Sequence, residues 1–218
     1  MLNIKAHRTS RNTVLLLAIL ISLVFRPIPA QAQGNAFGIP DFQDFAKSVQ
    51  NNEAGVLRGV YVPEMLAFPV VQQPAGNAGY VSPTDGEITQ FDMAAKFGNV
   101  GLLAHNNLSG RFFSQLAAGQ EVRLVYGDGK VEYFVITGIL KFQALEPTSP
   151  YSQFRDLGSA ETLTALQLFN KVYRGDRHVT FQTCMEANGE LSWGRLFVVA
   201  IPKSEHLKSA RFDWQLRR

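Results

Sequence analysis

The chain has little cysteine and little charge. Cys184 is the single cysteine among 218 residues, and charged side chains make up 18% of them. One cysteine excludes an internal disulfide framework and any zinc site built from several cysteines. Hydrophobic residues make up 46%, which suits a folded core and excludes a chain that is disordered throughout. The length predicts one compact domain with extensions.

The excess of positive charge is confined to the first residues. The formal net charge of the whole chain is +3, but residues 1–32 carry Lys5, Arg8, Arg11 and Arg26 and no acidic side chain. Without that segment the chain has 17 basic and 18 acidic residues, a net charge of −1. A nearly neutral body gives no electrostatic reason to expect nucleic acid as a partner.

Residues 1–32 have the anatomy of a secretory signal peptide. A basic stretch precedes an apolar run from Val14 to Phe25, and Ala30-Gln31-Ala32 supplies small residues before a cleavage point. A run of this length rises about 20 Å as a helix, less than the roughly 30 Å of a bilayer core. We therefore expect cleavage after Ala32, with an uncleaved signal-anchor at residues 12–28 as the alternative. Either way, we expect an exported protein of the cell surface or extracellular space, which contacts the membrane only through this segment.

The body of the chain is β-rich. Its clearest element is a hairpin in which alternating residues 121–126 and 131–138 flank the turn Gly127-Asp128-Gly129-Lys130. Further runs predict strands at residues 56–62, 68–71, 99–104, 178–184 and 196–201. Many short strands at close spacing favour a barrel or a sandwich over residues 56–202.

Helical signals are few. Residues 33–55 form a lead-in whose amphipathic stretch at 41–49 favours a short helix, and residues 159–173 hold one helical or irregular segment. Residues 203–218 are expected to be a polar, basic C-terminal tail.

A lone cysteine in an exported protein indicates either a working thiol or a buried structural one. A working thiol needs a basic or positively charged neighbour, most often histidine. His178 lies six residues before Cys184 in one predicted strand, about 20 Å away, and His206 lies in the polar tail. His105, which ends an apolar run and opens a loop, is therefore the candidate partner.

Arg195 is the third candidate residue. The pair Asn188-Gly189 signals a turn between Cys184 and Arg195, and a reversal there would bring Arg195 beside Cys184. Arginine cannot act as a base, but it can donate hydrogen bonds to a substrate carbonyl and to the oxyanion that forms on thiolate attack. A surface arginine on a strand is the alternative.

The segment Thr180-Phe181-Gln182-Thr183-Cys184 resembles the T-L-x-T-C motif of sortases, with Phe181 where leucine is usual. The order and spacing of His105, Cys184 and Arg195 are similar to those of the same family. The opening segments 60–63 and 69–71 are similar as well, so the resemblance covers about residues 56–202. Gln120 stands where the family has an acidic residue.

The resemblance implies a fold and an activity. The fold is an all-β, closed, eight-stranded barrel with short helices in its loops. The activity is that of a cysteine transpeptidase, which cleaves a sorting-signal peptide of the L-P-x-T-G kind and passes its acyl group to an amine of the cell wall or of a pilin. Cys184 would be the nucleophile, His105 the general acid and then the base, and Arg195 the residue that holds substrate and oxyanion. Thr183 and Trp193 are candidate substrate-binding residues.

This scheme calls for no cofactor and no metal. Glu186, Glu190 and the acidic residues at 85–87 match no calcium-loop spacing, so we expect no calcium site. Two alternatives stay open. A sortase-like hydrolase or thiol protease would use the same residues with water as the acceptor, and a non-catalytic barrel would bind peptide without using Cys184.

Overall fold

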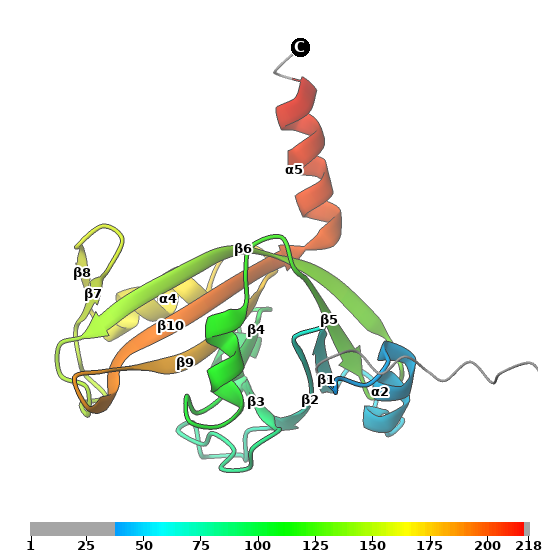
Figure 1. Ribbon diagram of the computed structural model, residues 1–218, viewed down its shortest axis with the longest axis horizontal. Coiled ribbons are helices and arrows are strands. Elements are labelled where there is room, and N and C mark those ends of the chain that lie inside the picture. The colour runs from blue at the N-terminus through cyan, green and yellow to red at the C-terminus, as the bar shows by residue number, and fades with distance from the viewer. Residues whose placement is uncertain (1–37, 216–218) are drawn as a thin grey trace, which may run out of the picture. The chain divides into compact units, whose positions relative to one another are not determined.

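The computed structural model describes residues 38–215, so the expected signal peptide at 1–32 lies outside the described range (Figure 1). Within it, the strands are Leu57–Val62 (β1), Leu66–Gln72 (β2), Ile88–Phe91 (β3), Val100–Leu103 (β4), Glu121–Tyr126 (β5), Val131–Ala144 (β6), Phe154–Asp156 (β7), Thr162–Leu163 (β8), Val179–Ala187 (β9) and Glu190–Pro202 (β10). The helices are Phe42–Val49 (α2), Asp92–Ala95 (α3), the 3₁₀ helix Ser109–Gln115 (η1), Ala165–Tyr173 (α4) and Lys203–Gln215 (α5). Among these helices, none combines the length and the apolar character needed to cross a membrane.

Eight of the strands close into a barrel. Their order is β10-β9-β4-β3-β2-β1-β5-β6, and β6 pairs with β10 to complete the ring. Neighbours in the ring are antiparallel except for two parallel pairs, β2–β3 and β4–β9. β7 and β8 continue the sheet from β6 outside the ring. The closed eight-stranded barrel that the resemblance implies is confirmed.

Strand alternation gives each barrel strand an inner and an outer face. Val179 and Phe181 of β9 and Leu196 and Val198 of β10 face inward and join the main core. Phe113 of η1 is fully buried in the same core, and its ring packs edge-on against Phe181 with 5.2 Å between centroids. This aromatic contact packs η1, and with it the segment that follows His105, onto the barrel.

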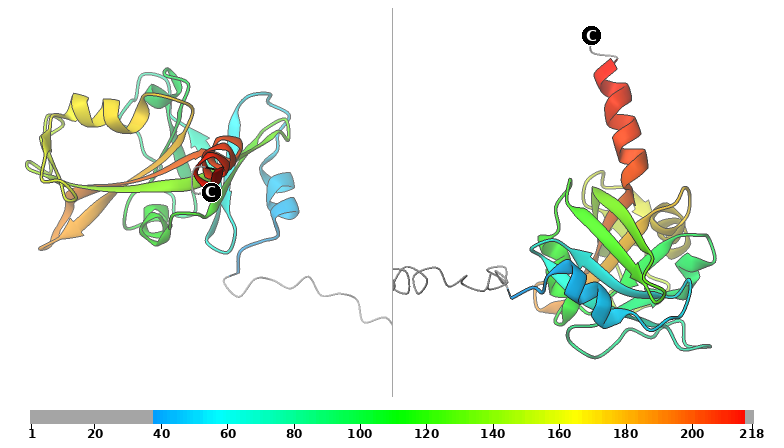
Figure 2. Two further views of the ribbon diagram at one scale, coloured as in Figure 1. Left: turned by 90° about the horizontal axis from the view of Figure 1, so that it is seen from above. Right: turned by 90° about the vertical axis from the view of Figure 1, so that its right-hand side faces the viewer.

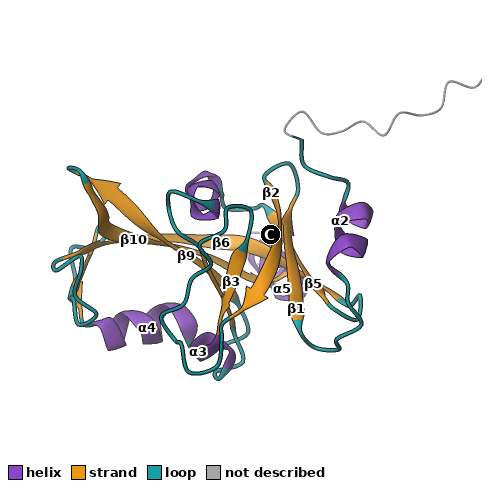
Figure 3. Ribbon diagram, turned by 90° about the horizontal axis from the view of Figure 1, so that it is seen from below, coloured by secondary structure: helices purple, strands orange, loops and turns teal. Residues whose placement is uncertain are grey.

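Helix α4 covers the outer face of β9 and β10 (Figure 3). Thr164 and Gln167 form a capping box that starts the helix. At its other end, the carbonyl of Val172 accepts a hydrogen bond from the Thr180 hydroxyl at 2.6 Å and also lies 3.0 Å from Nε2 of His178. These contacts fix the end of α4 on the neighbouring strand.

Helix α2 packs on another flank, against β1 and β5 (Figure 2). Asp41 caps it, and the helix expected at residues 41–49 is present. Its side chains Phe45 and Val49 lie over Gly59, where a Cβ would come within 2.9 Å of both. Glycine at this position is what lets the helix approach the strand.

Several elements differ from the sequence-based expectation. β3, β7, β8 and the four-residue helix α3 are too short to show a period, and η1 is a seven-residue 3₁₀ helix, which lacks the 3.6-residue period of an α-helix. β10 begins at Glu190, earlier than expected, because Asn188 and Gly189 both take positive φ and make a tight hairpin turn. The expected polar tail includes the helix α5.

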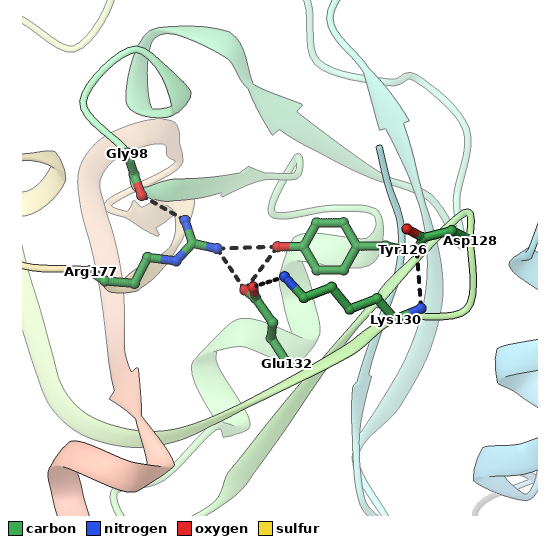
Figure 4. A network of polar contacts seen from close by, with 6 residues as sticks. All are labelled: Gly98, Tyr126, Asp128, Lys130, Glu132 and Arg177. Carbon is green, nitrogen blue, oxygen red and sulfur yellow. Dashed lines mark hydrogen bonds and ion pairs between the residues drawn. The ribbon is translucent and has the colours of Figure 1, made fainter. Parts of the chain in front are cut away.

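An ionic network joins the β5–β6 hairpin to Arg177, which lies just before β9 (Figure 4). Arg177 donates hydrogen bonds to the Glu132 carboxylate at 2.7 Å, to the Tyr126 hydroxyl at 3.1 Å and to the Gly98 carbonyl at 2.6 Å. Lys130 and Tyr126 also donate to Glu132, at 2.7 and 2.9 Å. Burial alone would raise the pKa of Glu132, but these hydrogen bonds outweigh it and lower the pKa to about 2. Burial raises the pKa of Tyr126 to about 12, which keeps its hydroxyl a donor.

Glu132 makes the stability of the fold depend on pH. Because its pKa falls from the ordinary 4.5 to about 2 on folding, its contribution is complete above pH 4.5 and is lost as the pH falls toward 2. We expect Glu132→Gln to cost about 1–2 kcal/mol at pH 7, a value reduced for solvent exposure of the carboxylate. Thermal unfolding of both proteins at several pH values measures this difference.

The exposed Glu64 supplies the matched control. Glu64→Gln should leave Tm unchanged at pH 7. A Tm difference between the natural chain and Glu132→Gln that persists unchanged at pH 2 would contradict the assignment.

Candidate functional site

The parallel pairing of β4 with β9 places His105 next to Cys184 along the sheet. Leu103 pairs with Gln182, and beyond the strand the amide of Ala104 donates to the Gln182 carbonyl at 3.3 Å. The next contact is the Thr183 hydroxyl, which donates to the Ala104 carbonyl at 2.8 Å. His105 follows Ala104, and Cys184 follows Thr183. The backbones of His105 and Cys184 therefore lie side by side just beyond these two contacts.

The antiparallel pairing of β9 with β10 sets Arg195 directly opposite Cys184. The reversal expected at Asn188-Gly189 is therefore present. Directly paired residues of antiparallel strands project to the same side of the sheet. Because Phe181 and Leu196 face the core, Cys184 and Arg195 share the outer face, and both are half-buried.

Arg195 is held by main-chain carbonyls. Its Nη1 donates to Ser192 and to Gly194, both at 2.9 Å, and its guanidinium carbon lies 5.9 Å from the ring centroid of Phe154. Its other nitrogens, Nε and Nη2, make no hydrogen bond to the part of the chain that the structure describes. The side chain is thus oriented while N–H donors remain available on the outer face that Arg195 shares with Cys184.

A tight turn follows His105. Its carbonyl accepts hydrogen bonds from the amides of Leu108 and Gly110, both at 3.0 Å, and its own side chain is exposed. A Cβ at Gly110 would lie 2.6 Å from the His105 carbonyl oxygen and 2.7 Å from that of Ala104. Contacts this close to backbone cannot be relieved by a side-chain rotation, so the turn requires glycine at position 110.

Helix η1 is also held by hydrogen bonds to the loop before β3. Arg111 makes two hydrogen bonds to the Asp85 carboxylate, at 2.7 and 2.9 Å, and the Gly86 amide donates to the Ser109 hydroxyl at 2.8 Å. The hydrogen bonds from Arg111 lower the pKa of Asp85, so the carboxylate stays charged. The segment after His105 is therefore fixed to the loop before β3.

Two hollows flank the β9–β10 hairpin. The first, called the aromatic pocket below, has a volume of about 300 Å³ and lies between α4 and the outer face of β9 and β10. Its lining includes the aromatic side chains Phe91, Phe154, Phe169, Tyr173 and Phe197, together with Gln182 and Arg195. The second, called the polar pocket below, has about 310 Å³, and its lining includes Asn106, Arg111, Ser114, Lys141, Cys184 and Glu186. An apolar chain suits the first, and a polar group suits the second.

The structure gives Thr183 and Trp193 different surroundings. Thr183 is buried and its hydroxyl donates to Ala104, so it positions the backbone before His105. Trp193 is half-buried within the register shift of β10 between Glu190 and Gly194.

Sequence reasoning missed two residues beside the site, Gln182 and Tyr173. Gln182 is two residues before Cys184, so strand alternation was a signal for it. Tyr173 belongs to α4, and no local pattern connects it with Cys184.

The described residues contain no group of three or more His, Cys, Asp or Glu side chains arranged to hold a metal ion. Cys184 is a free thiol. The chemistry that the arrangement supports is that of a thiol, an imidazole and a guanidinium.

No protein-family model matches the chain, and no curated protein matches it. Solved structures similar to it include sortase A from Listeria monocytogenes, which is 13% identical with a TM-score of 0.43 over 68% of this chain and 87% of that one. Sortase C-1 from Actinomyces oris is 12% identical with a TM-score of 0.43 over 75% and 82%. A lid mutant of sortase C1 from Streptococcus agalactiae is 16% identical with a TM-score of 0.43 over 90% and 91%. These three belong to the family that residues 180–184 resemble, while the barrel assignment rests on the strand pairing of this chain.

Proposed function

We propose that the chain is a sortase-like cysteine transpeptidase. The observation that carries the proposal is the strand pairing, in which Cys184 of β9 lies opposite Arg195 of β10 and the loop that begins with His105 leaves the neighbouring strand β4 beside Cys184. The motif at residues 180–184 and the aromatic pocket beside Arg195 support it.

In the first half of the reaction, the Cys184 thiolate attacks the carbonyl carbon of a peptide bond. A bond forms between Sγ and carbon, and the carbon–nitrogen bond breaks as His105 gives a proton to the leaving amine. Arg195 donates the hydrogen bonds that its Nε and Nη2 have available to the oxyanion formed on the way. The products are a thioester on Cys184 and a free amine.

In the second half, an acceptor amine attacks the thioester. His105 takes a proton from the amine, the bond between Sγ and carbon breaks, and Cys184 leaves as thiolate. The substrate is a sorting-signal peptide of the L-P-x-T-G kind, and the acceptor is an amine of cell-wall or pilin type. Water in place of the amine would make the same residues a hydrolase.

The proposal includes a division of the chain. Residues 1–32 direct export as a signal peptide or signal-anchor, residues 33–55 are a lead-in, residues 56–202 are the catalytic domain, and residues 203–218 are a polar tail. The activity then takes place outside the cytoplasm, where acceptor amines of the envelope are present.

The proposal predicts a thioester at Cys184. Residues 33–218 are mixed with a pool of L-P-x-T-G-type peptides, and intact mass is measured with and without hydroxylamine. We expect a peptide-sized adduct that hydroxylamine discharges as a hydroxamate, because hydroxylamine replaces the acceptor amine. Cys184→Ala should form no adduct.

The products also separate the alternatives. Release of peptide acid at the same rate with and without an added amine would favour the hydrolase. No adduct together with slow reaction of Cys184 toward a small thiol electrophile would leave a binding barrel.

Arg195 predicts a second result. Arg195→Met removes the oxyanion donors but not the nucleophile, so the rate of thioester formation should fall by about 100- to 1000-fold. Arg155 is an exposed arginine of β7, and Arg155→Met is the matched control that should keep the full rate. Equal rates for the two variants, measured by quenched mass spectrometry, would remove Arg195 from the mechanism.

The close contacts at Gly110 lead to a third prediction. Gly110→Ala should displace the His105 turn and lower turnover by at least about tenfold while the barrel stays folded. Gly138→Ala is the control, since a Cβ there meets nothing closer than 3.8 Å. Turnover and the melting curve are measured together. Full turnover in Gly110→Ala would show that the turn does not position His105.

A further inference from the structure

A hydrogen-bonded pair lies in the lining of the aromatic pocket. The Tyr173 hydroxyl donates to Oε1 of Gln182 at 2.5 Å, joining α4 to β9. Tyr173 is 2% exposed, and burial raises the pKa of its phenol, so the hydroxyl keeps its proton. This bond fixes the orientation of the Gln182 amide, because its oxygen end is committed to Tyr173.

The nitrogen end of the same amide is left for another partner. Within the described residues, Nε2 of Gln182 makes no hydrogen bond, and the side chain is half-buried in the pocket lining. Because this N–H group faces the open pocket, an acceptor on a bound ligand can take its hydrogen bond in place of water, and the aromatic walls lower the local dielectric constant around that bond. The aromatic pocket therefore contains an oriented donor besides the one on Arg195.

The position of Gln182 relative to Cys184 identifies the acceptor. Gln182 precedes Cys184 by two residues on the same face of β9, which is about 7 Å along a strand. An extended peptide advances by the same rise per residue. A peptide whose scissile carbonyl is at Cys184 and whose acyl side runs along β9 toward α4 thus presents its main chain to Gln182 two residues earlier.

We propose that Gln182, oriented by Tyr173, is a substrate-binding residue that sets the register of the peptide relative to Cys184. Its Nε2 donates a hydrogen bond to the main-chain carbonyl of the substrate residue two positions before the one that carries the scissile carbonyl. This inference rests on the proposed function for the identity of the substrate as a peptide. Tyr173 acts through Gln182 and is a positioning residue.

The test is a binding cycle in the Cys184→Ala background, where no chemistry takes place. The probe is the fluorescein-labelled pool of L-P-x-T-G-type peptides, followed by its best binder. That peptide is compared with an analogue in which one peptide bond is replaced by an alkene of the same geometry. The bond replaced is the one that contains the carbonyl proposed to accept from Gln182. Fluorescence anisotropy gives the Kd of each pair.

We expect the alkene analogue to bind about three- to tenfold more weakly than the parent, the range for one lost hydrogen bond. Adding Gln182→Met, which keeps the length of the side chain and removes the donor, should abolish that difference. Tyr173→Phe should reduce it, because the amide is then free to rotate. Gln182→Glu should bind the parent peptide more weakly than Gln182→Met does, since it places a carboxylate against the peptide carbonyl.

The controls are exposed residues of the same types, Gln153→Met and Tyr133→Phe, which should keep the full difference. An undiminished difference in Gln182→Met, or a pool that does not bind at all, would overturn the inference. Gln182-dependent binding in a chain that forms no thioester would instead overturn the proposed function and leave the inference standing.

Discussion

The parallel pairing of β4 with β9 is the constraint on which the candidate site depends. It carries His105 and Cys184 past the last paired residues together, and Thr183 extends the alignment by one more hydrogen bond. Parallel neighbours need a long crossover connection. The chain between β4 and β9 is that connection, and it supplies η1, β7 and α4, which contribute to the lining of the two pockets.

The ionic network around Glu132 is separate from the backbone groups that hold Arg195 and His105. Backbone groups hold the site: two carbonyls orient Arg195, and a turn of main-chain hydrogen bonds fixes His105. The network joins Glu132 to Arg177, and Arg177 lies before the start of β9, whereas Cys184 lies near its end. A substitution of Glu132 or Arg177 therefore does not remove the contacts that hold Arg195 and His105.

Local signals and long-range contacts explain what could be predicted from the sequence. Arg195 could be placed beside Cys184 because one turn, Asn188-Gly189, joins two recognisable strands. The barrel and the pairing with His105 required the family resemblance, since β4 and β9 are far apart in the chain. Tyr173 could not be linked to Gln182, because that contact exists only once α4 packs on the barrel.

The ring is closed by its last strand, and this has a consequence for how the chain folds. β10 pairs with β9 on one side and with β6 on the other, so the barrel stays open until residues 190–202 are available. During synthesis, the earlier strands are therefore made without the partner that covers their edges. Folding by such distant pairings is slow compared with folding by local contacts. Closure thus awaits β10, and a product truncated before β10 retains two unpaired edges, one on β9 and one on β6.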